Sequence, residues 1–119
     1  MPHGEYNHIE IPYDDEDRAK RFYSGVFGWE VGPPMSPEMD YRMFRTGEDQ
    51  GGAISAADEP GHLRVYFDTD DIDATRAKIQ ELGGQAGDKM PVQGYGWFAG
   101  CSDTEGNAFS LWQSDQSAS

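Results

Sequence analysis

The chain has 119 residues, a length typical of a single domain of roughly 100–150 residues. Its 22 acidic and 9 basic residues give a net charge of −13, so we expect it to bind neither nucleic acid nor an anionic membrane surface. No run approaches the roughly 18 apolar residues of a membrane span, no signal pattern is seen, and the single cysteine fits a reducing compartment, all of which predicts a cytoplasmic protein.

An alternating segment near the N-terminus has a counterpart 54 residues later in the chain: residues 8–14 match residues 62–68. Polar and apolar residues alternate in both, which is typical of a half-buried strand. The sequence therefore predicts strands at 8–13 and 62–67, and an internal repeat.

Each of these strands is followed by an acidic run and then a helical pattern, which predicts helices over about 15–26 and 72–82. Gly28 and Gly83 mark the ends of the two helices. In the first helix, four residues recur on one face and are expected to pack on the sheet: Ala19, Phe22, Tyr23 and Val26.

Short strands separated by turn residues complete each half. They are predicted at 29–31, 41–46 and 53–57 in the first half, and at 85–87, 97–102 and 108–113 in the second. This order predicts an α+β fold made of two βαβββ repeats. The predicted core residues are Ile9, Ile11, Phe22, Val65, Ile79 and Leu111.

Five short strings occur in an order and spacing that point to a known family: NHIEIP from Asn7, RAKRFY from Arg18, FGW from Phe27, GYGWF from Gly94 and DTEGN from Asp103. Together they resemble the vicinal oxygen chelate (glyoxalase, bleomycin resistance and dioxygenase) superfamily, and most of all its single-domain "predicted glyoxalase-related" group. The resemblance implies one such domain over residues 5–114. It also implies an open, curved, barrel-like sheet with helices on its outer face, and a homodimer.

The resemblance further implies a divalent metal with four ligands on the concave face, of which this chain keeps two. His8 and His62 match the first-strand ligands, whereas Ser55 and Ser110 stand where the last-strand glutamates would be. A neutral hydroxyl is a poor ligand for a divalent cation, and the glyoxalase reaction also needs a carboxylate base. We therefore expect no standard glyoxalase I activity.

Glu10 is the remaining carboxylate, and two roles are open to it. Strand alternation aims it at the same face as His8, so His8, His62 and Glu10 could hold zinc, manganese or iron. Alternatively, Glu10 pairs with Arg64, its counterpart in the other repeat, because a buried charge needs a partner. We favour the ion pair.

Aromatic residues accompany these polar groups. Tyr66, Ser110 and Trp112 alternate onto the expected inner face, where they either line a pocket for a ligand or only fill the barrel. The loop from Gly94 to Trp97 either closes over a ligand or is a plain turn. We expect the domain to bind a small organic molecule, in the manner of bleomycin-resistance proteins. The expected contacts are His8, Glu10, Ser55, His62, Arg64, Tyr66, Trp97, Ser110 and Trp112. The alternative is a metal-dependent lyase, isomerase or dioxygenase that uses His8, His62 and Glu10.

The strong acidity has two interpretations. One is a well-solvated surface, and the other is adaptation to high salt, where ions screen the self-repulsion of the −13 charge. The low number of lysines favours the second interpretation.

Overall fold

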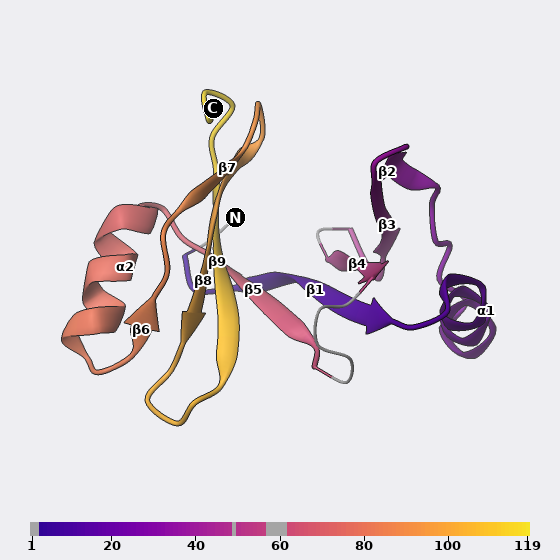
Figure 1. The fold of residues 1–119 in the computed structure, drawn as a ribbon, viewed down its shortest axis with the longest axis horizontal. Coiled ribbons are helices and arrows are strands. Elements are labelled where there is room, and N and C mark those ends of the chain that lie inside the picture. Colours follow the sequence, from indigo (N-terminus) through magenta and orange to yellow (C-terminus); the bar gives the residue numbers. More distant parts are fainter. Residues whose placement is uncertain (1–2, 49, 57–61) are drawn as a thin grey trace. The chain divides into compact units, whose positions relative to one another are not determined.

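The computed structural model describes residues 3–48, 50–56 and 62–119. It has an α+β fold that divides into two compact units, Asn7–Arg64 and Met1–Tyr6 with Val65–Ser119. Each unit contains a strand, a helix and then further strands in the same order (Figure 1). The α+β class and the two repeats predicted from the sequence are confirmed.

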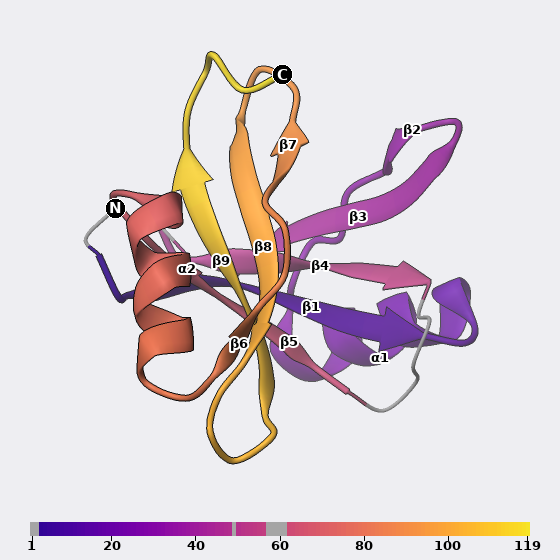
Figure 2. The ribbon, with the colours of Figure 1, turned by 60° about the vertical axis from the view of Figure 1, so that its left-hand side comes forward.

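The first unit forms a four-stranded sheet with the order β2-β3-β4-β1. Its elements are β1 (Tyr6–Tyr13), α1 (Glu16–Phe27), β2 (Pro34–Ser36), β3 (Met39–Arg45) and β4 (Gly51–Ala56). β1 and β4 run parallel, whereas β3 is antiparallel to both β2 and β4 (Figure 2). The predicted strand at 53–57 corresponds to β4, and its last residue lies outside the described residues.

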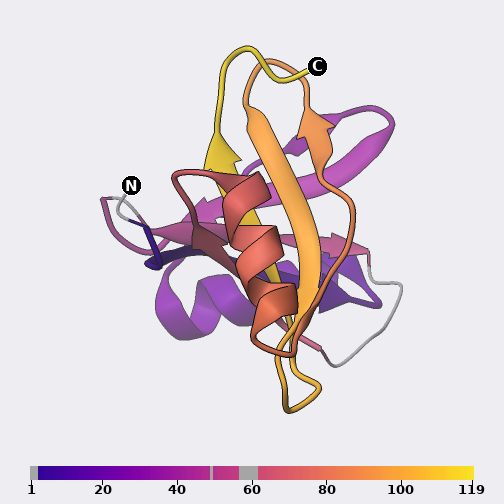
Figure 3. The same ribbon diagram turned by 90° about the vertical axis from the view of Figure 1, so that its left-hand side faces the viewer.

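The second unit repeats this pairing. Its elements are β5 (Arg64–Asp68), α2 (Ile72–Glu81), β6 (Gln85–Ala86), β7 (Met90–Val92), β8 (Gly96–Ser102) and β9 (Ala108–Ser114). β5 is parallel to β9, β9 is antiparallel to β8, and both short strands pair with β8. The helix α2 lies along this sheet (Figure 3).

The register of the two parallel pairs shows how closely the repeats correspond. Ser55 lies opposite Pro12 in the first unit, and Ser110 lies opposite Tyr66 in the second. Pro12 and Tyr66 are the two residues that the 54-residue repeat matches. The two serines therefore hold equivalent positions, as the superfamily resemblance implies.

Both helices begin at an aspartate that caps them. The side chain of Asp15 accepts a hydrogen bond from the backbone nitrogen of Arg18, and Asp71 does the same for Ala74. Gly28 ends α1 with a φ of 75°, a left-handed conformation that glycine adopts without a side-chain clash. In the described part of the chain, neither helix is long and apolar enough to cross a membrane.

Each unit has its own buried cluster between helix and sheet. The first contains Ile11, Val31, Phe44 and Ile54, and the second contains Ile72, Ala99, Cys101 and Leu111. The predicted burial of Ile11 and Leu111 is confirmed, and Ile9, Val65 and Ile79 are half-buried.

The predicted burial of Phe22 is wrong. Phe22 is 58% exposed and Val26 is 57% exposed, whereas Ala19 and Tyr23 of the same helix pack against the cluster. The reason is Trp29, whose ring stacks on Tyr23 with a centroid distance of 5.4 Å and on Phe44 at 4.4 Å. The indole fills the space between helix and sheet, so only a narrow stripe of α1 meets the core.

The predicted strand at 29–31 is also wrong, because these residues have no strand structure and β2 begins at Pro34 instead. The carbonyl oxygen of Trp29 accepts a hydrogen bond from the Ser24 hydroxyl at 2.8 Å, a helix side chain rather than a neighbouring strand. The sequence missed β7, a short edge strand whose central Pro91 argues against a strand. The homodimer and the cytoplasmic location stay predictions.

Candidate functional site

One face of the first sheet carries three of the predicted site residues. Alternation along β1 places Ile9 and Ile11 against the helix and leaves His8 and Glu10 on the opposite face. Ser55 joins them on this face, since it lies opposite both Pro12 of β1 and Tyr41 of β3. The sequence thus brings His8, Glu10 and Ser55 together on the face predicted for them.

Tyr41 connects two of these residues directly. Its hydroxyl donates a hydrogen bond to Glu10 Oε2 at 2.8 Å. The hydroxyl oxygen of Tyr41 also lies 2.5 Å from His8 Nε2. The imidazole and phenol rings are stacked, with an angle of 12° between their planes. We refer to His8, Tyr41 and Glu10 as the polar trio.

The hydrogen bonds within the polar trio determine which atoms donate a hydrogen and which accept one. A phenol has one hydrogen to donate, and Tyr41 gives it to Glu10, which accepts it as a carboxylate. His8 must therefore donate its Nε2 hydrogen to the Tyr41 oxygen. Sequence reasoning missed Tyr41, although it opens the predicted strand at 41–46; alternation alone could not show that it reaches across to β1.

Burial keeps the imidazole neutral. Partial burial lowers the pKa of His8 below its ordinary value of 6.5, and the nearby Glu10 carboxylate only partly offsets this. At neutral pH His8 is therefore an uncharged imidazole, with one nitrogen that donates and one that accepts.

The second sheet has an aromatic face in the equivalent position. Tyr66 lies opposite Ser110 in the register of β5 and β9, and Phe98 lies opposite Trp112 in that of β8 and β9. Ser110 is almost fully buried, and the three aromatic side chains are half-buried. Tyr66, Ser110 and Trp112 share a face as predicted, and Phe98 is an addition that the sequence did not single out.

Trp97 lies on the other face of this sheet. It packs against the helix-side cluster of the second unit, and its indole nitrogen donates to Asp115 Oδ2 at 3.1 Å. The Lys89 ammonium sits 4.6 Å from the centre of its ring. Alternation along β8 explains the placement, because Trp97 and Phe98 are neighbours and so face opposite ways.

The donor set of this chain does not fit the metal that the superfamily resemblance implies. Within residues 3–48, 50–56 and 62–119, no group of three or more His, Cys, Asp or Glu side chains could hold a metal ion. The side chains of His8 and Glu10 are joined through Tyr41, and serines stand at the last-strand positions. His62 is exposed, and the pairing of Glu10 with Arg64 stays a prediction.

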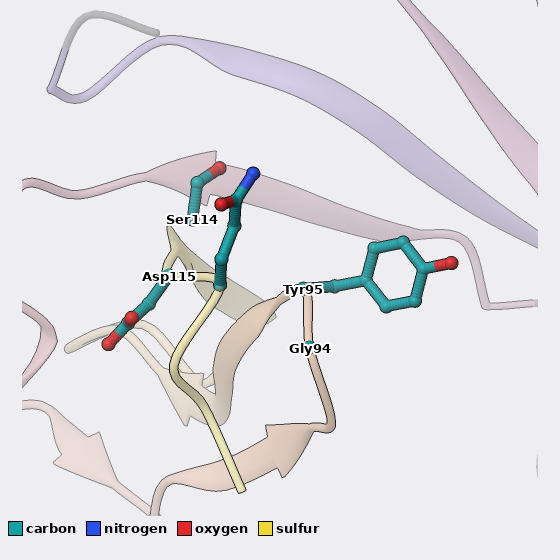
Figure 4. Close-up of a pocket in the computed structure, with 5 residues that line it drawn as sticks. Gly94, Tyr95, Ser114 and Asp115 are labelled. Atoms are coloured by element: carbon teal, nitrogen blue, oxygen red, sulfur yellow. The ribbon is translucent and has the colours of Figure 1, made fainter.

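The loop from Gly94 to Trp97 borders a cavity of about 380 Å³ lined by Gly94, Tyr95, Ser114, Asp115 and Gln116. Figure 4 shows that the labelled side chains diverge, with the Tyr95 ring pointing away from Ser114 and Asp115. The loop is also bonded to the C-terminal segment, through Gly94 to the Ala118 carbonyl at 3.0 Å and through Asp115 to the Tyr95 carbonyl at 2.8 Å. No convergent set of polar groups is built there.

Residues 8–112 match a family model described as the glyoxalase-like domain, which covers both repeats, the polar trio and the aromatic face. The chain belongs to the glyoxalase-like family. A glyoxylase-like domain-containing protein of Didymella fabae is 30% identical over 124 residues, which span 92% of this chain and 93% of that protein.

Two longer bacterial relatives are also similar. The "Putative glyoxylase CFP32" of Mycobacterium tuberculosis is 34% identical over 107 residues, and the match covers 86% of this chain but 41% of that protein. The anthracycline biosynthesis protein DnrV of Streptomyces peucetius is 29% identical over 130 residues, covering 88% of this chain and 45% of that protein. This glyoxalase-like chain therefore spans less than half the length of both.

Among solved structures, methylmalonyl-CoA epimerase from Mycobacterium tuberculosis has a TM-score of 0.68 with 14% identity, over 94% of this chain and 88% of the epimerase. A hypothetical protein from Bacillus halodurans has a TM-score of 0.69 with 13% identity, over 98% of both chains. At such low identity these likenesses show the fold alone.

Proposed function

We propose that this glyoxalase-like domain binds a small organic molecule and does not carry out the standard glyoxalase I reaction. The observation that carries the proposal is the hydroxyl of Tyr41, which is hydrogen-bonded to both His8 and Glu10. A metal joining these two residues would have to displace that hydroxyl. Serines at positions 55 and 110 leave no carboxylate to replace the lost ligands.

The aromatic face supports a planar organic ligand. Tyr66, Phe98 and Trp112 keep part of their surface accessible, and ring stacking adds about 0.5–1.5 kcal/mol to the burial of an aromatic group. Polar groups that fix the orientation of a ligand accompany the apolar lining of such sites, and Ser110 lies on the same face as these aromatic rings. We expect ligand contacts from His8, Glu10, Ser55, His62, Arg64, Tyr66, Ser110 and Trp112.

The name of one relative suggests a probe. DnrV is named for anthracycline biosynthesis, and anthracyclines are planar, hydroxylated and carry an amine. A net charge of −13 attracts such a cation. We therefore choose an anthracycline as the first ligand to test.

The test is a calorimetric titration of the protein with an anthracycline, at moderate and high salt. We expect saturable binding that Trp112→Ala weakens at least tenfold, about 1.4 kcal/mol. Tyr95→Ala is the matched control, because it removes an aromatic ring that is 65% exposed in the same unit and should leave binding unchanged. Binding that Trp112→Ala and Tyr95→Ala affect equally would contradict a site on the aromatic face.

The metal-dependent alternative has its own test. Titration calorimetry with zinc and with manganese should show no tight stoichiometric binding to the unmodified protein. If Glu10 is held by Arg64, then Arg64→Ala frees the carboxylate and strengthens divalent-metal binding. Tight binding by the unmodified protein would favour the enzyme hypothesis with His8, His62 and Glu10 as ligands.

A further inference from the structure

The first unit has a cavity of its own at the start of α1, with a volume of about 310 Å³. The end of β1, the connection that follows it and the first two turns of α1 form its walls. Tyr13 and Tyr23 of this lining pack against the buried cluster between helix and sheet, whereas His8 and Glu10 lie on the opposite face of the sheet. We call it the helix-side cavity. Its volume is at the lower end of the range of about 300–1,000 Å³ for ligand cavities, so only a small molecule fits.

Three aromatic rings supply the apolar part of the helix-side cavity: Tyr13, Phe22 and Tyr23. The rings of Phe22 and Tyr23 have a centroid distance of 5.2 Å and an angle of 82° between their planes, so they present two walls nearly at right angles. Tyr13 is fixed by the hydrogen bond that its hydroxyl donates to Asp40. Phe22 remains 58% exposed, so an apolar ligand that covered it would remove hydrophobic surface from water.

The same cavity carries charges of both signs that are not engaged within the protein. Asp14 and Arg18 belong to its lining, and both are exposed. Neither side chain forms an ion pair with another residue in the described part of the chain. Asp15 differs, because its side chain accepts the hydrogen bond of the Arg18 backbone nitrogen and caps α1. The cavity therefore offers one guanidinium and one carboxylate to a ligand.

This combination of groups selects the charge of the ligand. An anion without a positive group would be repelled by Asp14, by Asp15 and by the net charge of −13. A cation without a negative group would be repelled by the guanidinium of Arg18. A molecule with an ammonium and a carboxylate group can form a charge-assisted hydrogen bond with each partner.

We propose that the helix-side cavity binds an aromatic α-amino acid as its zwitterion. The aromatic side chain lies against Phe22 and Tyr23, the ammonium group faces Asp14, and the carboxylate faces Arg18. This is a second binding site in addition to the one proposed above, and it does not depend on it.

Three probes of similar size separate the contributions of the two charges. L-phenylalanine carries both charged groups, phenethylamine lacks the carboxylate, and 3-phenylpropanoate lacks the ammonium. Each is titrated at low salt while the backbone amide signals of residues 12–23 are followed in ¹H–¹⁵N spectra. We expect L-phenylalanine to bind about threefold to tenfold more tightly than either of the others, the value of one hydrogen bond. Equal or tighter binding of phenethylamine or 3-phenylpropanoate would overturn the proposal, as would the absence of any shift with L-phenylalanine.

Two variants assign the charged contacts. Arg18→Gln should abolish the preference for L-phenylalanine over phenethylamine, because the carboxylate loses its partner. Asp14→Asn should abolish the preference for L-phenylalanine over 3-phenylpropanoate, because the ammonium loses its partner. Arg21→Gln is the matched control, since Arg21 is an exposed residue of α1 outside the lining, and its Nε donates to the Asp17 carbonyl. Equal effects of Arg18→Gln and Arg21→Gln would mean that net charge alone matters and would overturn the site.

Phe22→Ala tests the aromatic wall. It should weaken the binding of all three probes by a similar factor, because it removes apolar surface that none of their charged groups contacts. The substitutions at Asp14, Arg18, Arg21 and Phe22 all replace exposed side chains, so circular dichroism and the melting temperature should show the fold retained. Unchanged binding of L-phenylalanine to folded Phe22→Ala would overturn the placement of the ligand in this cavity.

Discussion

Gly52 of β4 lies against the carbonyl oxygen of Ile9 in β1. A Cβ atom built on Gly52 would stand 2.1 Å from that oxygen, well inside van der Waals contact, and the two residues are direct partners in the parallel register. The obstructing atom belongs to the backbone, so it cannot swing aside as the end of a flexible side chain would. We therefore expect Gly52→Ala to lower the free energy of unfolding by about 1–3 kcal/mol, as overpacking does. Urea unfolding followed by circular dichroism measures it.

Gly25 in α1 provides the matched control for that substitution. A Cβ atom there meets nothing within 4 Å, and alanine is a better helix former than glycine by about 1 kcal/mol. Gly25→Ala should therefore raise the free energy of unfolding. If both glycine substitutions changed stability in the same direction, the close approach of β1 and β4 would not be the cause.

Phe22 and Ile54 give opposite predictions for removal of a large apolar side chain. Ile54 is fully buried, so Ile54→Ala should cost about 2–5 kcal/mol in unfolding free energy. Phe22 is 58% exposed, so Phe22→Ala should cost much less, under about 1 kcal/mol. Chemical denaturation of the two variants measures both values. A cost for Phe22→Ala as large as that for Ile54→Ala would show that the outer face of α1 is covered in solution.

The sequence predicted the order of strands and helices because the residues that decide it act locally. Asp15 and Asp71 cap helices through their own neighbours, and alternation along β1 follows from the strand period alone. The face of α1 that meets the core depends on the ring of Trp29, which lies outside the helix. Trp29 settles that face by stacking on Phe44, a contact that no periodicity in the helix itself contains.

The residues of the candidate site also fall into those that local sequence patterns predict and those that depend on contacts between strands. Strand alternation predicted that His8 and Glu10 share a face, and the superfamily resemblance implied that Ser55 joins them. Tyr41 was missed because its role depends on the register of β3 against β4, which brings a residue 31 positions from Glu10 within hydrogen-bonding distance. Trp97 was expected at the site as part of the loop from Gly94, but it is the second residue of β8, and strand alternation turns it to the face opposite to that of Phe98.

Tyr13 should remain protonated far into the alkaline range. Partial burial, together with the hydrogen bond that its hydroxyl donates to Asp40, raises its pKa from 10.0 to about 12. The contribution of this tyrosine to stability is fully present below pH 10 and is lost as the pH rises from there toward 12. Ultraviolet titration of the unmodified protein and of Tyr13→Phe should differ by one phenol with the raised value.

Asp40→Asn is the second variant for this test. It removes the carboxylate charge that disfavours the tyrosinate, so the pKa of Tyr13 should fall toward its ordinary value. Tyr13 ionising near pH 10 in the unmodified protein would mean that its hydroxyl is not bonded to Asp40 in solution.

The net charge of −13 predicts that salt stabilises the protein. Like charges on a folded surface repel one another, and the Debye length falls from about 10 Å at 0.1 M salt to about 3 Å at 1 M. The melting temperature should therefore rise with potassium chloride over this range. A double variant, Asp14→Asn with Asp70→Asn, removes two exposed carboxylates and should melt higher at low salt and respond less to added salt. A melting temperature independent of potassium chloride in both proteins would remove the argument for adaptation to a high-salt environment and leave the acidity as a solvated surface.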